Sequence, residues 1–358
     1  MGHRRRGLSA DTILQGVLIV DKPAGLTSHA VCQEVKSALR VGKVGHGGTL
    51  DPFATGLLPL LINGATRLMP FIQSRDKVYE ATIRLGVRTD TMDPTGEITA
   101  EADASHLSDE AIATAVTGFL GAQKQLIPRF SAARVEGKHL YEYARAGEEV
   151  EQPTKDIEIF ALEISEVRRQ GTVVDVDLTV HCGAGTYVRA LADDLGERLQ
   201  VGGHLAMLRR TRVDRLDLAE GVSMEALVAQ SNAWRAERTV LIEAGEKQPF
   251  LPERNARTWR EWLGGALRPV ASVLPDVAVL RVDGPTAHHV TSGGALRKSG
   301  LTPLESFGSL VYGAGDRVLI EHPDGHRGVA LVRAVVASAA MDRVADDAVV
   351  FEVERVLR

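Results

Sequence analysis

The segment from Gly45 to Gly56 reads GHGGTLDPFATG and presents a single carboxylate, Asp51, among glycines and small residues. Asp-Pro in such a stretch is typical of a turn, because the Asp side chain bonds nearby backbone groups and Pro presets φ. A phosphate-binding loop is excluded, because that motif requires Gly-Lys-Ser/Thr and no lysine follows Gly47 or Gly48. The alternatives left open are a turn residue and a reactive carboxylate that attacks carbon or moves a proton.

Two elements are expected to precede this loop. Residues 16–20 form an apolar run that ends in Asp-Lys-Pro-Ala-Gly, which predicts a strand followed by a turn. Ser28 is predicted to be the N-cap of a helix that stops at Gly42. The apolar residues on the core face of this helix are Val31, Val35, Ala38 and Leu39. The loop with Asp51 therefore follows a helix.

A strand is predicted over residues 78–87, because apolar residues alternate along it. Tyr79 then lies on the opposite face from Val78, where its ring can face a substrate. The cluster that follows, from Asp90 to Gly96, contains two carboxylates but lacks the spacing of a calcium loop. We interpret it as a turn. Ser108 is predicted to cap the next helix, which extends to Leu120.

The second half of this region contains another helix with a charged residue near its start. Two alternating strands, over residues 157–167 and 172–182, lead to a helix predicted over residues 186–199. The core stripe of this helix consists of Val188, Leu191, Ala192, Leu195 and Leu199. Arg189 lies off this stripe, and without further information it is a surface arginine.

Composition indicates a globular chain whose charges are segregated. With 358 residues, 44% of them hydrophobic and 25% charged, the chain can bury a full core and divides most simply into two domains. The net charge of −5 by itself argues against nucleic acid. Acids are concentrated in Glu97–Glu110 (five acids, no bases) and Glu148–Glu166 (seven acids, one base), whereas Met1–Leu60 (seven bases, four acids) and Gln123–Arg145 (five bases, two acids) are basic. Such segregation permits a positive cleft on an acidic protein, although ordinary solvated faces would look the same.

The compartment follows from what the chain contains. Its longest apolar runs, such as Leu57–Ile62, are far shorter than the roughly 20 residues of a membrane span. No cleavage site follows the arginines at positions 4–6, so we expect a cytoplasmic protein without a signal peptide. The two cysteines, Cys32 and Cys182, lack zinc-site spacing and are expected to be reduced core residues. We expect no metal.

The composition changes after a helical pattern near residues 223–229. Residues 231–265 mix charges of both signs and contain Trp234, Trp259 and Trp262. These tryptophans either stack on RNA or anchor packing, and packing is favoured. Strands are predicted at residues 277–282 and around Val318 and Val329. The predicted organisation is a domain over residues 1–230, a linker or insertion over 231–268 and a second domain over 269–358.

Four motifs in order resemble those of the bacterial tRNA pseudouridine synthase B (TruB) family. They are GVLIVDKPAGLTSH at 16–29, HGGTLDPFATG at 46–56, DKVYEA at 76–81 and GTYVR at 185–189. The resemblance runs from about Gly16 to Thr211 and is specific because four motifs share order and spacing. It implies an α+β fold with a mixed, mainly antiparallel central sheet flanked by helices. The later strands resemble, weakly, the small β-barrel PUA domain of the same family.

The resemblance also implies an activity and a set of residues. Family members isomerise uridine 55 in the T-loop of tRNA to pseudouridine, a reaction that demands no redox step, energy source, metal or cofactor. Asp51 matches the catalytic carboxylate, either a nucleophile at C1′ or a group that promotes elimination, and Arg189 matches its charge partner. Tyr79 matches the tyrosine that stacks on the flipped base. The other matched positions are His46 near the extruded nucleotide, Tyr187 and Leu208 lining the uracil pocket, and Lys22 supporting the loop. The loop glycines are expected to let RNA approach Asp51.

Two departures from the family pattern concern one phosphate contact. Gly47 stands where a hydroxyl residue is common, and Gly183-Ala184 replaces a common Ser-Lys. The alternative function is a non-catalytic RNA-binding or tRNA-folding protein on the same scaffold. The presence of Asp51, Tyr79 and Arg189 together favours the enzyme. Guide-RNA-dependent relatives share these motifs, but no long basic tail or partner-binding arm is evident, so we expect a monomer that binds the tRNA T-stem-loop without an obligatory protein partner.

Overall fold

A computed structural model describes residues 15–244, 265–274, 276–292, 296–300, 312–321, 328–335, 337–343, 345–346 and 348–357. The first part of the chain contains the strands β1 (Gly16–Lys22), β2 (Val44–His46), β3 (Thr55–Ile62), β4 (Lys77–Leu85), β5 (Val87–Thr89), β6 (Ile98–Glu101), β7 (Gly121–Leu126), β8 (Arg134–Val135), β9 (Lys138–His139), β10 (Thr154–Gln170), β11 (Val173–Cys182), β12 (Gly203–Val213), β13 (Leu216–Asp217), β14 (Val222–Ser223) and β15 (Leu267–Arg268). Its helices are α1 (Ser28–Leu39), α2 (Met69–Gln73), α3 (Asp109–Thr117), α4 (Leu140–Ala146), α5 (Val188–Arg198) and α6 (Met224–Glu243). No helix in the described ranges is both long and apolar enough to cross a membrane.

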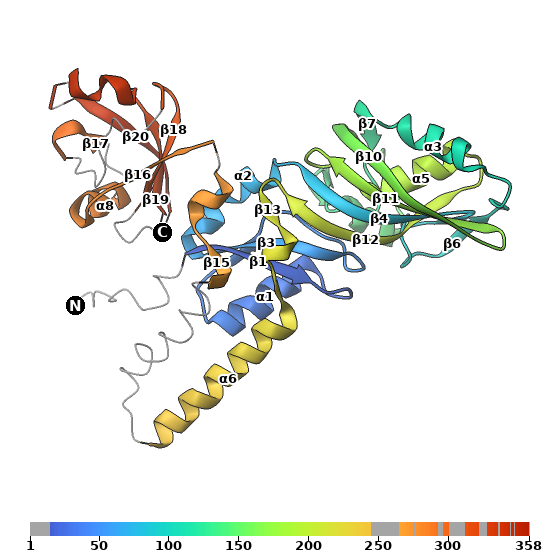
Figure 1. Cartoon of the computed structure of the whole chain (residues 1–358), viewed down its shortest axis with the longest axis horizontal. Helices are drawn as coiled ribbons and strands as arrows, with labels where there is room; N and C mark the ends of the chain where they lie inside the picture. The colour runs from blue at the N-terminus through green and yellow to red at the C-terminus, as the bar shows by residue number, and fades with distance from the viewer. Residues whose placement is uncertain are drawn as a thin grey trace.

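One large sheet forms the centre of this part (Figure 1). Its main path runs β14-β1-β3-β12-β4-β11-β10-β7, and β13, β15 and β2 pair at its sides. The β1–β14 and β3–β12 pairs are parallel, and all other neighbouring pairs are antiparallel. The expectation of a mixed, mainly antiparallel sheet is confirmed.

Helices cover the sheet in two groups. Helices α3 and α5 lie against strands β4, β10, β11 and β12, where Ile112 and Leu191 join a core with Ile83 and Val176 (Figure 1). Helices α1 and α6 lie at the β1 end, where Val31 packs on Leu18 and the first turns of α6. The two helical groups therefore cover different strands of the sheet.

The start of α1 differs from the prediction in one respect. Thr27, not Ser28, is the N-cap, and its side chain accepts a hydrogen bond from the Ala30 N–H. The Ser28 hydroxyl instead bonds to Leu50 and is 97% buried. The two adjacent hydroxyl residues could not be distinguished by sequence, because either suits an N-cap. The helix ends at Arg40, in the left-handed conformation, close to the expected stop at Gly42.

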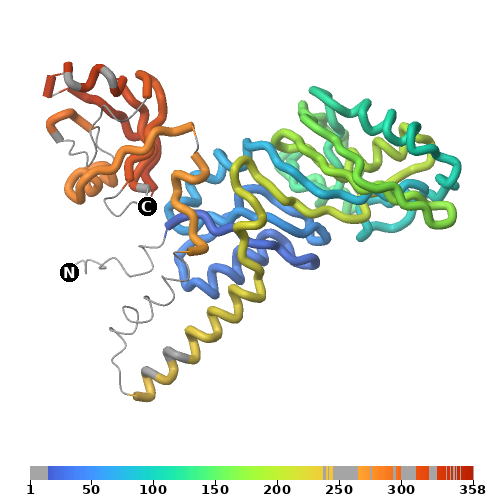
Figure 2. Tube along the Cα trace, in the orientation of Figure 1, coloured from blue at the N-terminus to red at the C-terminus, as the bar shows by residue number. Residues whose placement is uncertain are grey.

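A second sheet forms the C-terminal part. Its order is β16 (Ala278–Arg281), β18 (Arg317–Glu321), β19 (Gly328–Ala334), β20 (Val349–Val356) and β17 (Leu296–Arg297), and helix α8 (Gly284–Thr291) packs on it. It curls as a half-barrel consistent with a PUA-like domain. Figure 2 shows it as the orange and red unit beside the blue first strands. Leu319, Leu331 and Leu357 join one apolar cluster with Val17 and Leu61 of the large sheet.

The segment between the two parts begins as a helix. Helix α6 runs without a break across position 230, where the linker was expected to begin. Trp234 lies on α6, packs at the edge of the cluster that contains Val31, and stacks under Arg40 at 5.5 Å. This tryptophan has a packing role. Trp259 and Trp262 lie outside the described residues. Cys32 and Cys182 are buried and free, as predicted.

Candidate active site

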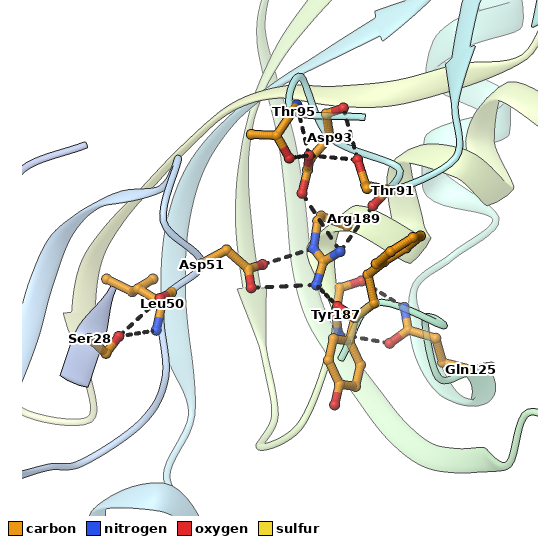
Figure 3. Close-up of polar contacts among 10 residues, drawn as sticks. Ser28, Leu50, Asp51, Thr91, Asp93, Thr95, Gln125, Tyr187 and Arg189 are labelled. Carbon is orange, nitrogen blue, oxygen red and sulfur yellow. Dashed lines mark hydrogen bonds and ion pairs between the residues drawn. The ribbon is translucent and has the colours of Figure 1, made fainter. Parts of the chain in front are cut away.

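Asp51 lies in the connection between β2 and β3, which is held from several directions. The Lys22 ammonium, at the end of β1, donates to the carbonyls of Pro52 (3.2 Å) and Ala54 (2.6 Å). On the other side, Ser28 Oγ accepts from the Leu50 N–H (2.8 Å) and donates to the Leu50 carbonyl (2.9 Å). The residues on both sides of Asp51 are thereby fixed, which orients its carboxylate (Figure 3).

The carboxylate of Asp51 faces the guanidinium of Arg189. Arg189 Nε lies 2.8 Å from Asp51 Oδ2, and Nη2 lies 3.4 Å from Oδ1. Arg189 is the second residue of α5 and is only 4% exposed, whereas the Asp51 side chain is 34% exposed. The pair thus has one buried partner and one that is partly exposed. The expectation that Arg189 lies off the core stripe agrees with this arrangement, but its alternative as a surface residue is wrong.

The remaining nitrogens of Arg189 bind two further segments of the chain. Nη1 donates to the Thr91 carbonyl (2.9 Å) and lies 3.7 Å from Asp93 Oδ2, while Nη2 donates to the Phe130 carbonyl (3.1 Å). Asp93 is buried and is itself held by the Thr91 hydroxyl and the Thr95 N–H (Figure 3). The segment from Asp90 to Gly96 is a turn, as predicted, and it also anchors Arg189.

Two opposing effects act on the pKa of Asp51. Burial raises the pKa of this carboxyl above its ordinary value, and the nearby Asp93 acts in the same direction. Arg189 and Lys22 oppose the shift, because their positive charges favour the ionised form. Arg189 is therefore the main group that keeps the carboxylate charged as water is excluded.

Tyr79 lies beside this pair on the core face of β4. Its side chain is 6% exposed and shares its face with Ala81 and Ile83, as the predicted alternation requires. Burial raises the pKa of Tyr79 to about 12, against the opposing influence of the positive charge of Arg210. Arg210 is 1% exposed and donates from Nε to Leu57 O (2.7 Å) and from Nη2 to Gly48 O (3.1 Å). The phenol is therefore protonated near neutral pH.

Tyr187 and Leu208 lie at the same site. The Tyr187 backbone exchanges two hydrogen bonds with the buried Gln125 side chain, N–H to Oε1 at 2.8 Å and carbonyl to Nε2 at 3.0 Å. Leu208 on β12 is 7% exposed. Gln125 thus aligns the residue that precedes α5, and with it the direction in which Arg189 leaves the helix.

These residues line an open cleft of about 350 Å³. The lining residues include Asp51, Tyr79, Tyr187, Arg189 and Leu208 from the predicted set. They also include four bases, Lys77, Lys155, Arg189 and Arg210, and Asp51 is the single acid among them. The cleft is positive although the chain is acidic, because acids are concentrated elsewhere. Within the described residues, no group of three or more potential metal ligands occurs.

Two family models match this chain. One, described as "TruB family pseudouridylate synthase (N terminal domain)", matches residues 36–188, and "tRNA pseudouridylate synthase B C-terminal domain" matches residues 189–274. The tRNA pseudouridine synthase B of Synechococcus elongatus is 43% identical over 270 residues, which cover 75% of this chain and 90% of that protein. This chain belongs to the TruB family.

Other comparisons agree with this assignment. The TruB-family protein of Cutibacterium acnes, named tRNA pseudouridine synthase B, is 47% identical over 208 residues, covering 58% of this chain and 70% of that protein. A solved structure titled "Structure of H/ACA RNP bound to a substrate RNA containing 2'-deoxyuridine" matches with a TM-score of 0.61 at 25% identity, covering 96% of this chain and 85% of that chain. The pseudouridine synthase fold expected for the chain is confirmed.

Two residues matched to the TruB pattern lie outside the cleft lining. His46 on β2 does not line it, and burial together with Arg210 lowers the pKa of its imidazole. His46 Nδ1 is a buried atom with no hydrogen-bond partner among the described residues. Lys22 is fully buried under the Asp51 loop, and burial lowers the pKa of its ammonium to about 8. Its ammonium contacts the backbone of that loop.

Three glycines of the TruB loop, Gly45, Gly47 and Gly56, have a different role from the one expected. A Cβ on Gly47 would lie 2.6 Å from Ile72 Cγ2, and one on Gly45 would lie 2.7 Å from Met69 Sδ. Gly56 adopts φ +96°, and a Cβ at this position would collide with the Arg210 backbone. These glycines let the chain pack on itself rather than open a path to Asp51. The hydroxyl residue common at position 47 has no space in this chain.

Sequence reasoning missed several residues of the site. Asp93 and Thr91 were interpreted only as turn residues, and Gln125, Arg210 and Ser28 were given no place in the site. Each acts through the backbone or through Arg189, so its role depends on a contact far away in sequence. No local pattern singled out Gln125 or Arg210, because their strands, GAQKQL and GHLAMLRRTRV, contain several other polar residues.

Proposed function

We propose that this chain isomerises uridine 55 in the T-loop of tRNA to pseudouridine. The reaction breaks the bond between ribose C1′ and N1, turns the base and joins C1′ to C5. The observation that carries the proposal is the Asp51–Arg189 pair at the edge of a positive cleft in a TruB-family chain. Its relatives named tRNA pseudouridine synthase B support tRNA as the substrate.

Each side chain at the cleft has a part in this proposal. Asp51 acts on C1′, as a nucleophile or by promoting elimination, and Arg189 keeps it ionised. Extrusion of the uridine from the T-loop costs a few kcal/mol, and stacking on Tyr79 worth about 1–3 kcal/mol offsets much of it. Tyr187 and Leu208 contact the uracil. His46 occupies space near the extruded nucleotide, and Lys22 supports the loop. No cofactor enters these steps.

The test is the substitution Asp51→Asn, which removes the charge and keeps the shape. We expect pseudouridine formation on a T-stem-loop transcript to fall below detection, while RNA affinity stays within a few-fold. The readout is nucleotide-resolution mapping of pseudouridine by chemical adducts. Asp156→Asn is the matched control, because Asp156 is 88% exposed and is not among the lining residues. Appreciable product from Asp51→Asn would remove this residue from its role.

The alternative is a non-catalytic RNA-binding or tRNA-folding protein. It predicts that the wild-type chain binds tRNA without forming pseudouridine, and mapping on total tRNA separates the two. The intact ion pair at the cleft favours the enzyme, because binding alone does not require a buried arginine aimed at a carboxylate.

We also propose that the chain acts as a monomer in the cytoplasm, without an obligatory protein partner. Relatives named tRNA pseudouridine synthase B are up to 47% identical among those compared, whereas the H/ACA ribonucleoprotein chain is 25% identical. Sedimentation of the purified chain with and without tRNA tests the oligomeric state. Activity that requires an added protein or guide RNA would overturn this part.

A further inference from the structure

Lys155 differs from the other bases that line the cleft. Arg189 and Arg210 are buried and donate to carboxylate or carbonyl oxygens of the chain. Lys77 is also buried, and its ammonium donates to the carbonyls of Gln73 and Arg75. Lys155 is exposed, and no ion pair or hydrogen bond of its ammonium occurs within the described residues. It is the lining base whose charge remains available to a ligand.

The backbone of Lys155 is paired next to the residue that holds Tyr187. In the β7–β10 ladder Lys155 lies opposite Gln125, whose side chain holds the backbone of Tyr187. The Lys155 side chain extends over Gly185, so closely that a Cβ there would coincide with its ammonium and last methylene. Gly185 adopts φ +84°, which favours glycine. The absence of a side chain at 185 therefore allows Lys155 to reach the cleft.

The placement of this charge is unusual for its segment. Lys155 is the single base among seven acids between Glu148 and Glu166. None of the acids of that segment is among the residues that line the cleft. One positive charge from an acidic strand thus faces the same space as Asp51.

We propose that Lys155 binds a backbone phosphate adjacent to the target uridine and holds the nucleotide in its flipped position. This rests on the proposed function. A flipped nucleotide turns its own phosphates toward the enzyme. Each phosphate contact by a lysine steepens the fall of log binding constant with log salt concentration by about 0.7–0.9. An unneutralised ammonium at the cleft mouth supplies this contact, while Asp51 acts on the ribose.

The experiment uses three variants of the full chain with a T-stem-loop RNA. Lys155→Met keeps the aliphatic stem over Gly185 and removes the charge, and Lys155→Arg keeps the charge. Lys124→Gln removes a charge from the neighbouring strand, where Lys124 is 76% exposed and is not among the lining residues. We expect Lys155→Met to weaken binding about tenfold and to lower the salt slope by about 0.7–0.9. Lys155→Arg and Lys124→Gln should retain the wild-type slope.

A second measurement locates the contact. Replacing single phosphates around the target uridine by neutral methylphosphonates should weaken wild-type binding at one linkage, and that replacement should have no further effect on Lys155→Met. An unchanged salt slope in Lys155→Met, or the same loss in Lys124→Gln, would overturn the inference. Loss in Lys155→Arg equal to that in Lys155→Met would also overturn it, since packing alone would then explain the result. Wild-type pseudouridine formation, measured in parallel, shows separately whether the proposed function holds.

Discussion

At the scale of single residues, the environment of Arg189 decides what the cleft can do. Its guanidinium is 4% exposed and contacts Asp51, Asp93 and two carbonyls. A charge buried to this extent is retained only when it is paired and hydrogen-bonded. Losing Arg189 would leave Asp51 and Asp93 as two carboxylates without a common counter-charge. This residue therefore couples the charge state of Asp51 to the integrity of the site.

The pH dependence of the reaction tests this coupling. Burial raises the pKa of Asp51, so the active carboxylate is lost as pH falls through a value above the ordinary one of about 3.9. Arg189→Met removes the opposing charge, so the pKa should rise further and the acid limb of the rate should move to higher pH. We expect the rate at pH 7 to fall at least about 100-fold. Single-turnover rates across pH check both points, and an acid limb that does not move would contradict them.

Tyr79 tests stacking against proton transfer. Its pKa of about 12 keeps the hydroxyl protonated near neutral pH, so it can donate a proton but cannot act as a pre-formed phenolate. Tyr79→Phe keeps the ring, and Tyr79→Leu removes it. If the hydroxyl moves a proton, Tyr79→Phe should lower the single-turnover rate about 100-fold with little change in binding. Equal rates for Tyr79→Phe and the wild type would leave stacking as the only role.

At the scale of elements, α1 and the Asp51 loop are joined by Ser28. Thr27 caps the helix, and Ser28 satisfies both backbone groups of Leu50, next to Asp51. Both residues are hydroxyls at the same helix end, yet one stabilises the helix and the other positions the loop. The position of the loop therefore depends on its hydrogen bonds to the start of α1.

This distinction predicts different effects for two adjacent substitutions. Thr27→Ala should cost about 1 kcal/mol of stability and leave the turnover rate unchanged. Ser28→Ala should cost about 1–3 kcal/mol, because buried groups of Leu50 lose their partner, and should also lower the turnover rate. Denaturant unfolding and single-turnover rates of both variants provide the test. Equal kinetic effects in the two variants would argue against a positioning role for Ser28.

The glycines of the loop predict a second effect at this scale. Gly47→Ala places a methyl group 2.6 Å from Ile72 Cγ2, so we expect a loss of about 1–3 kcal/mol in the free energy of unfolding. Gly42→Ala is the control, because its nearest contact would be 3.4 Å from Asn63 Oδ1. Chemical denaturation measures both. Similar stabilities for the two variants would show that the loop has room at position 47.

At the scale of the whole molecule, the two sheets share one apolar cluster. Leu319, Leu331 and Leu357 pack with Val17 and Leu61, and Arg355 donates to the carbonyl of Arg67. The C-terminal sheet therefore packs directly on the strand that leads to Lys22 and the Asp51 loop. The C-terminal sheet thereby contributes to the stability of the catalytic part.

The shared cluster predicts coupled unfolding. Leu357 is 4% exposed, so Leu357→Ala should lower the free energy of unfolding by about 2–5 kcal/mol. This loss should also appear in the unfolding of the large sheet. Val335→Ala, at a site 43% exposed in the same domain, should change stability by less than about 0.5 kcal/mol. Calorimetry and hydrogen exchange on β1 check this. Exchange in β1 that is unaffected by Leu357→Ala would show that the two parts unfold independently.

The amino-acid sequence by itself determined the local features of this protein. The faces of α1 and α5, the alternation of β4 that turns Tyr79 inward, and the turn from Asp90 to Gly96 follow from residue type and spacing, because neighbours within a few positions decide them. The motif order indicated Asp51 and Arg189 as partners through resemblance to a family.

Only the tertiary structure decided how these features meet. Asp51 and Arg189 are 138 positions apart. The turn with Asp93 contacts the Arg189 guanidinium, and Gln125 of β7 binds the backbone at the start of α5. No local pattern encodes which side chain fills the space at Gly47 or which lysine passes over Gly185. Those outcomes depend on the register of strands distant in sequence, because burial and pairing are properties of the packed molecule.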